Sequence, residues 1–164
     1  MNTVRDLFFY ELAIMIQMER SGSVLLSMLI ARRVQDANLE RTLHGIEQDG
    51  HRHVDKINAC LQDLGTFSLQ TQAASVDGIS SDFEHFMRMQ PAPELLDLYA
   101  LDTAKRFSQL AVVGYTDLVD SATALGHETC AERLRSNLTE KAAGLRRLDS
   151  SRHEVRRRIL VTTG

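Results

Sequence analysis

The sequence predicts an all-α protein, an antiparallel four-helix bundle with one long crossover that carries a short extra helix. The 164 residues include only two prolines and no tryptophan, and Gly-rich or Asn-Gly hairpin signals are lacking. Apolar residues recur at helical spacing over four stretches of roughly 30 residues, each about 45 Å long as a helix. The length favours a single domain, residues 1–164, with one core.

Glycines and prolines set the limits of the predicted helices. Gly65 and the polar residues after it end the second helix, and the short helix stops before Pro91 and Pro93. Gly126 is a common C-terminal helix signal, and its tight turn makes the last two helices antiparallel. The connection between the second and third long helices is much longer, which is the ferritin-like topology. The predicted helices span about 4–32, 36–64, 76–89, 94–125 and 127–160.

Composition limits the function classes. The formal net charge of -3 argues neither for nor against a nucleic-acid partner. There is no run of 18 apolar residues, and the N-terminus lacks a signal-peptide layout, so we expect a cytoplasmic protein without a membrane span. Cys60 and Cys130 are too few for a disulfide framework and are expected to be buried free thiols.

The stretch from Arg41 to Lys56 is the densest in potential metal ligands, with three histidines and three acids. Placed on a helix, however, these side chains do not converge. His44 and His51 fall on the face expected to meet water. Only Asp49 and His53 can face inward, Asp49 on the flank of the apolar stripe and His53 near its middle.

The other long helices offer an uneven set of inward polar groups. Glu19 lies near the centre of the apolar stripe of the first helix, where an ionised carboxylate needs a partner. The stripe of the third helix holds no carboxylate, and Ser108 on its edge is a poor substitute as a ligand. On the fourth helix Glu140 is expected to point away, whereas Lys141 lies near the stripe. A di-metal site needs ligands from all four helices, so this pattern indicates a poor metal cage.

Four stretches also resemble a known family. They read V-R-D-L-F-F-Y-E-L-A-I-M-I-Q-M-E-R in the first helix, G-H-R-H-V-D-K-I-N-A-C-L-Q-D-L-G in the second, V-D-G-I-S-S-D-F in the short helix, and Y-T-D-L-V-D-S-A-T-A-L-G-H-E-T-C-A-E-R-L across the last turn. In order and spacing the chain resembles the YciE/YciF-type ferritin-like proteins, a bacterial stress-associated group. The resemblance implies a ferritin-like fold, a dimer, and acids and a His arranged for a di-iron-type centre.

The chain departs from that family where the metal ligands would lie. Glu19 and Asp49 fall where the family has inward acids, and His53 falls where it has Gln or His. The family's Val-Glu-His-Tyr-Glu-type stretch on the third helix reads F-S-Q-L-A here, from Phe107 to Ala111, so serine and alanine replace its acids and glutamine its His. The fourth-helix run of glutamates reads T-E-K, which leaves Lys141 at an inward place.

These departures favour a non-catalytic, stress-associated bundle protein with no cofactor and no catalytic residues. Its degenerate di-metal site is predicted to be a buried polar cluster of Glu19, Asp49, His53 and Lys141. The alternative is an enzyme that holds a single Fe, Mn or Zn ion through Glu19, Asp49 and His53, with oxidase or peroxide-scavenging activity. The sequence identifies no small-molecule substrate.

Partner surfaces are less sharply indicated. The resemblance implies a homodimer, and Phe83, Phe86, Met87 and Met89 of the short helix are candidate interface residues, although such segments more often cover a core. The only basic patch is the segment 146–158, with six arginines against two acids. Arginines near a helix C-terminus are favoured by the helix dipole, so a solvated helix end is expected there rather than a nucleic-acid site.

Overall fold

The described residues form four long helices and one short helix. The computed structural model describes residues 1–32, 34–67 and 69–162, and its helices are α1 (Val4–Ala31), α2 (Ala37–Asp63), α3 (Ala74–Arg88), α4 (Pro93–Ala124) and α5 (Glu128–Thr162). Each predicted helix limit differs from the observed one by at most two residues. The described residues contain no strand, which confirms the predicted all-α class.

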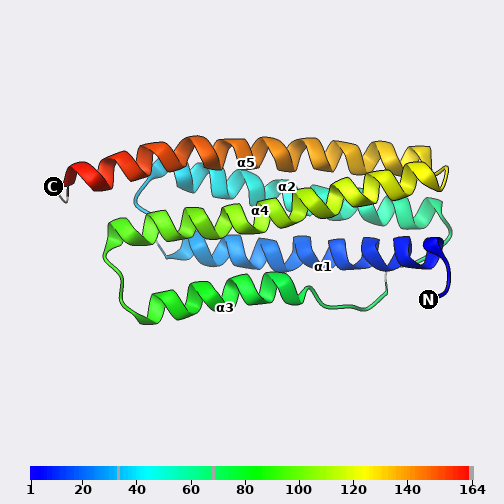
Figure 1. Ribbon diagram of the computed structural model, residues 1–164, viewed down its shortest axis with the longest axis horizontal. Helices are drawn as coiled ribbons and strands as arrows, with labels where there is room; N and C mark the ends of the chain where they lie inside the picture. The colour runs from blue at the N-terminus through cyan, green and yellow to red at the C-terminus, as the bar shows by residue number, and fades with distance from the viewer. Residues whose placement is uncertain (33, 68, 163–164) are drawn as a thin grey trace.

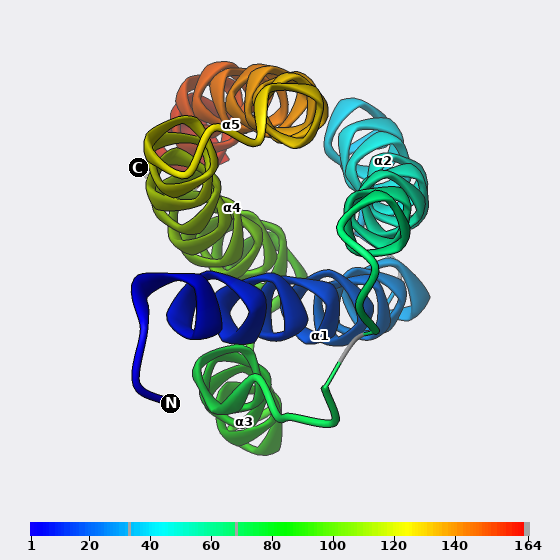
Figure 2. The same cartoon turned by 90° about the vertical axis from the view of Figure 1, so that its right-hand side faces the viewer.

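The long helices form the bundle, and the crossover places α3 outside it. Figure 1 shows α1 antiparallel to α2 and α4 antiparallel to α5, while α2 and α4 run in the same direction. The chain must therefore return along the bundle between α2 and α4, and α3 lies on this return. Viewed from the end, the four long helices surround a common centre, with α3 on the outer side of α1 (Figure 2).

Capping side chains, a proline and a glycine mark the ends of the helices. Thr3 and Asp6 form a capping box, in which the Thr3 side chain accepts from the Asp6 amide at 3.1 Å and the Asp6 carboxylate accepts from the Thr3 amide at 3.0 Å. Asp36 caps α2 by accepting from two backbone amides of its first turn. Pro93 begins α4, and Gly126, at a φ of 73°, permits the left-handed turn into α5.

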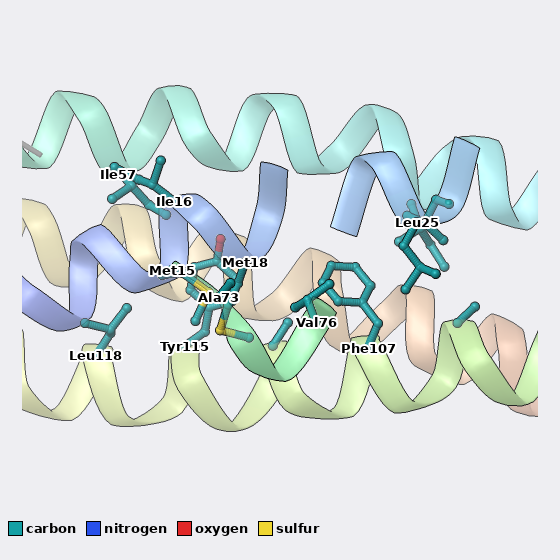
Figure 3. Close-up of a cluster of buried hydrophobic side chains, with 14 of the residues drawn as sticks. Met15, Ile16, Met18, Leu25, Ile57, Ala73, Val76, Phe107, Tyr115 and Leu118 are labelled. Carbon is teal, nitrogen blue, oxygen red and sulfur yellow. The ribbon is translucent and has the colours of Figure 1, made fainter. Parts of the chain in front are cut away.

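The core lies between the long helices and is sealed on one side by α3. Figure 3 shows side chains of one buried cluster, including Val76 from the short helix with Phe107 and Tyr115 from α4. Phe83 of α3 is also fully buried. The ring of Phe107 fills the space above Gly22 of α1, where an added Cβ would lie only 2.0 Å from the ring. The close approach of α1 and α4 therefore requires glycine at this point.

The four candidate interface residues of the crossover fall in different environments. Phe83 belongs to the core, and Phe86 stacks on the Tyr99 ring of α4 with 4.0 Å between ring centroids. Met87 packs against the core while partly exposed, whereas Met89 is 63% exposed. The aromatic residues of this segment thus hold α3 onto the bundle.

Helix α1 is the one described helix that is long and apolar enough to cross a membrane by length and composition. Half of its most apolar window is buried inside the bundle. Core helices meet the same criterion, so this finding does not by itself indicate a membrane span.

Candidate functional site

The carboxylate of Glu19 on α1 is buried inside the bundle, where the residue is 1% exposed. Its Oε1 accepts a hydrogen bond from the Tyr115 hydroxyl at 2.8 Å and lies 3.0 Å from His53 Nδ1. Its Oε2 accepts from Lys141 Nζ at 2.7 Å. The α1 carboxylate thus has one partner from each of α4, α2 and α5. We call these four residues the central cluster.

Lys141 is enclosed as completely as the carboxylate it neutralises. The side chains of Lys141 and Glu19 are each 1% exposed. The Lys141 ammonium lies 4.8 Å from the centroid of the Phe107 ring, within the range of a cation–π contact. Lys141 therefore holds its charge between a carboxylate and an aromatic face, in the packed interior.

A second layer of polar groups supports the central cluster. The Asn137 side-chain amide, one turn before Lys141, donates to the backbone carbonyl of His53 at 3.2 Å and to the Tyr115 hydroxyl at 3.4 Å. Ser108 of α4 is fully buried. Its Oγ atom and the Oδ1 atom of Asn137 have no hydrogen-bond partner among the described residues.

His53 links the central cluster to the surface. Its second ring nitrogen, Nε2, lies 3.2 Å from Oε2 of Glu140, whose side chain is 32% exposed. Lys56 Nζ donates to the other Glu140 oxygen at 2.9 Å. Glu140 was expected to point away, and this prediction is wrong, because its flexible side chain reaches across to the α2 histidine. An imidazole can donate to both carboxylates only when both of its nitrogens carry protons.

Electrostatics determine the ionisation of Glu19 and Tyr115 at neutral pH. Burial alone would raise the pKa of Glu19, but the Lys141 charge and the hydrogen bond and charge of His53 outweigh it and lower that pKa to about 2. Burial raises the pKa of Tyr115 well above its usual value, and the negative charge of Glu19 adds to the effect. Glu19 is therefore an ionised acceptor, and Tyr115 is a neutral donor.

The structure brings together Glu19, His53 and Lys141 but not Asp49. The Asp49 side chain, 17% exposed, pairs with Arg52 one turn later and lies 3.8 Å from a guanidinium nitrogen of Arg147. The expectation that Asp49 joins the buried cluster is therefore wrong. Its side chain is short and lies on the flank of α2. There Arg52, three residues later on the same helix, and Arg147 of α5 are its charged partners. Glu19, Asp49 and His53 consequently do not form one ligand set.

The residues at this place do not fit a di-iron-type centre. Among the described residues, no group of three or more His, Cys, Asp or Glu side chains is arranged to hold a metal ion. Ser108 and Ala111 of α4 are buried and supply no carboxylate. The Lys141 ammonium contacts Glu19, the buried acid that a metal would need. His44 and His51 are exposed on the outer face of α2, as expected.

The sequence reasoning missed Tyr115, Asn137 and the inward reach of Glu140. Tyr115 follows Ala111 by four residues and precedes Leu118 by three, which is the spacing of the apolar stripe of α4. A tyrosine on such a face is buried up to its hydroxyl, which then needs a partner. Asn137 likewise lies four residues before Lys141. Helical spacing was therefore sufficient to identify Tyr115 and Asn137 as inward residues, but not to identify their hydrogen-bond partners.

Comparison with known proteins places the chain among structures of the same fold. The family described as "Domain of unknown function (DUF892)" matches residues 3–158. No curated protein matches. The stress protein YciF of E. coli has a TM-score of 0.88 at 18% identity, with 94% of this chain and 98% of that chain covered.

Two further solved structures show the same likeness. YcfI of Rhodopseudomonas palustris, provisionally described as a structural protein, has a TM-score of 0.85 at 19% identity, covering 90% of this chain and 94% of its own. A protein of Xanthomonas campestris pv. campestris has a TM-score of 0.81 at 14% identity, with coverage of 98% and 99%. At these identities the likeness establishes the fold.

Proposed function

The chain belongs to the DUF892 family, and we propose that it is a non-catalytic, stress-associated bundle protein in which the central cluster takes the place of a di-metal centre. The contact that carries this proposal is the 2.7 Å hydrogen bond between Lys141 Nζ and Glu19 Oε2. It supplies from the protein the positive charge that a metal would otherwise bring to the buried carboxylate.

The charge of Lys141 also opposes metal binding. An ion bound to Glu19 would lie only a few ångströms from the ammonium, because both groups contact the same carboxylate. At about 4 Å and an effective dielectric constant of about 20, a divalent ion and the ammonium repel each other by roughly 8 kcal/mol. The Tyr115 hydroxyl and His53 already occupy the other carboxylate oxygen. The carboxylate therefore has its partners without an ion.

The proposed role is structural. The central cluster ties α1, α2, α4 and α5 together at one level of the bundle, through one side chain from each. The likeness in fold to a stress protein and to a protein provisionally described as structural supports such a role. The proposal includes a cytoplasmic homodimer, as the family resemblance implies.

Metal analysis of protein purified without chelator tests the proposal. We expect far less than one Fe, Mn or Zn ion per chain, and no rise in melting temperature when Fe²⁺, Mn²⁺ or Zn²⁺ is added. A stoichiometric ion that raises the melting temperature would instead support a metal-dependent oxidase or peroxide scavenger, since an ion that binds only the folded state stabilises it.

A rebuilt site provides the positive control. The double substitution Ala111→Glu and Lys141→Glu restores two inward acids to the bundle centre. Without metal, the clustered negative charge should lower the melting temperature strongly. With Fe²⁺ or Mn²⁺ the variant should recover, whereas the unmodified protein should not respond. If both proteins respond equally, Lys141 does not exclude metal.

A further inference from the structure

The only two cysteines of the chain meet at the far end of α2 from its Asp36 cap. Cys60 of α2 is 0% exposed and Cys130 of α5 is 4% exposed. Cys60 Sγ lies 3.8 Å from the Cys130 carbonyl oxygen, and the two thiol side chains also contact each other. Both are free thiols, as the sequence predicted. Two residues 70 positions apart are therefore held as a dithiol between neighbouring helices.

The two thiols are not equivalent. The hydrogen bond from Cys130 lowers the pKa of Cys60, burial opposes this, and the Arg133 guanidinium lowers that pKa further. The contact with Cys60 and burial both raise the pKa of the Cys130 thiol. Cys60 is consequently the sulfur that more readily becomes a thiolate, and Cys130 is its protonated neighbour.

The dithiol lies one layer beneath the surface. Arg133, one turn after Cys130, forms an ion pair with Asp63, one turn after Cys60. Their side chains are 32% and 55% exposed, so this ion pair is a thin cover over the thiols. An exposed ion pair of this kind is held together only weakly. Beside it, Cys130 lines a cavity of about 290 Å³ together with His127 and Leu64. A small oxidant in this cavity would lie beside Cys130, and Cys60, which does not line the cavity, is the next sulfur inward.

We propose that Cys60 and Cys130 form a redox modification site that reacts with a hydroperoxide and closes to a disulfide between α2 and α5. The Cys60 thiolate attacks the terminal oxygen of the hydroperoxide, the O–O bond breaks, and the released alkoxide takes a proton to leave as an alcohol. Cys60 is then a sulfenic acid.

The second step involves the neighbouring thiol. The Cys130 sulfur attacks the Cys60 sulfur, an S–S bond forms, and the S–O bond breaks. The hydroxide leaves with the Cys130 thiol proton as water. In total, two thiols lose two electrons and two protons, and one hydroperoxide becomes one alcohol and one water. With hydrogen peroxide the products are the disulfide and two waters.

The disulfide would close a loop that contains the crossover, α3 and α4. A loop of about 70 residues restricts the unfolded chain strongly, and we expect oxidation to raise the melting temperature by on the order of 10 °C. The modification would thereby convert exposure to peroxide into a more stable bundle. It uses neither the central cluster nor a metal, so it is independent of the proposed function.

The experiment treats the folded wild-type protein with hydrogen peroxide, followed by alkylation and mass spectrometry. We expect the loss of two hydrogens per chain, one cross-linked peptide pair joining Cys60 to Cys130, the higher melting temperature, and reversal of all three by dithiothreitol. Diamide, which joins accessible thiols without peroxide, should give the same cross-link. A diamide cross-link without a peroxide cross-link would overturn the hydroperoxide step, and the absence of both would overturn the pairing.

Matched single variants separate the two thiols. In Cys130→Ser the reaction should stop at a sulfenic acid on Cys60, which dimedone labels, whereas Cys60→Ser should label far more slowly at Cys130. Circular dichroism verifies that each variant folds, and the wild-type cross-link provides a readout that needs no substitution. Faster labelling of Cys130 than of Cys60, or disulfides between chains only, would refute the assignment.

Discussion

Replacing Lys141 with methionine tests the energetics of the central cluster most directly. The substitution keeps a long side chain of similar shape beside Phe107 but removes the ammonium 2.7 Å from Glu19 Oε2. Glu19 then retains the Tyr115 hydroxyl and His53, both on its other oxygen. Because the carboxylate is 1% exposed, water cannot replace the lost donor without opening the bundle.

The expected cost is about 3–5 kcal/mol of unfolding free energy at pH 7, the usual loss when one partner of a buried ion pair is removed. The lowered pKa of Glu19 gives a second measure. Its fall from 4.5 to about 2 corresponds to about 3 kcal/mol of preference for the ionised form in the folded protein. The variant can recover part of this by binding a proton at Glu19, so the lower half of the range is the better expectation.

Urea denaturation at pH 7, with the slope of the transition compared between proteins, measures the loss. Lys56→Met is the matched control. This substitution also removes a lysine that donates to a glutamate, Glu140. The side chains of Lys56 and Glu140 are 30% and 32% exposed, so the loss of unfolding free energy should be no more than about 1 kcal/mol. The double variant Glu19→Gln with Lys141→Met should recover most of the lost stability. A Lys141→Met variant as stable as Lys56→Met would refute the reasoning.

Three further outcomes are expected. Because the pKa of Glu19 is lowered on folding, its contribution to the unfolding free energy is fully present above about pH 4.5 and is lost as pH falls toward 2. The difference in unfolding free energy between wild type and Lys141→Met should therefore close over this range, and denaturation curves in which it does not close would contradict the prediction. Replacing both exposed histidines, His44 and His51, with alanine should change the unfolding free energy by no more than about 0.5 kcal/mol, and a loss several times larger would mean that their face is not free. Light scattering at tens of micromolar should return twice the 18.4 kDa chain mass, and a monomer would remove the homodimer from the proposal.

The fold was accessible from the sequence because helical spacing and chain breaks carry most of its information. The apolar stripes predict which side of each helix faces the core, and Gly65, Gly126 and the two prolines predict several of the helix ends. The same geometry identified Glu19, His53 and Lys141 as inward groups on three helices, and the structure places them in contact. An ionised carboxylate on a core face requires a partner, and the number of candidates was small.

The errors concern residues at the edges of the apolar stripes. There a helical wheel gives the direction in which a side chain leaves the helix but not how far its polar end extends. Asp49 is short, so its carboxylate stays at the flank beside Arg52 and Arg147. Glu140 has one more methylene, and its carboxylate bends toward His53 although its backbone position faces outward. Side-chain length and the competition among nearby arginines decide these cases, and both depend on how the helices pack.

The buried charges of the central cluster have an effect on helix alignment that apolar side chains would not have. An ion pair in a core adds little to stability compared with apolar residues of the same volume, since desolvation of both charges offsets their attraction. Apolar side chains, however, tolerate sliding and rotation of one helix against another, whereas the Glu19 oxygens meet Lys141, His53 and Tyr115 in one arrangement only. Any shift of one helix along the bundle would leave a charge or a hydroxyl without its partner, at a cost of several kcal/mol. We therefore infer that the central cluster specifies the alignment of α1, α2, α4 and α5.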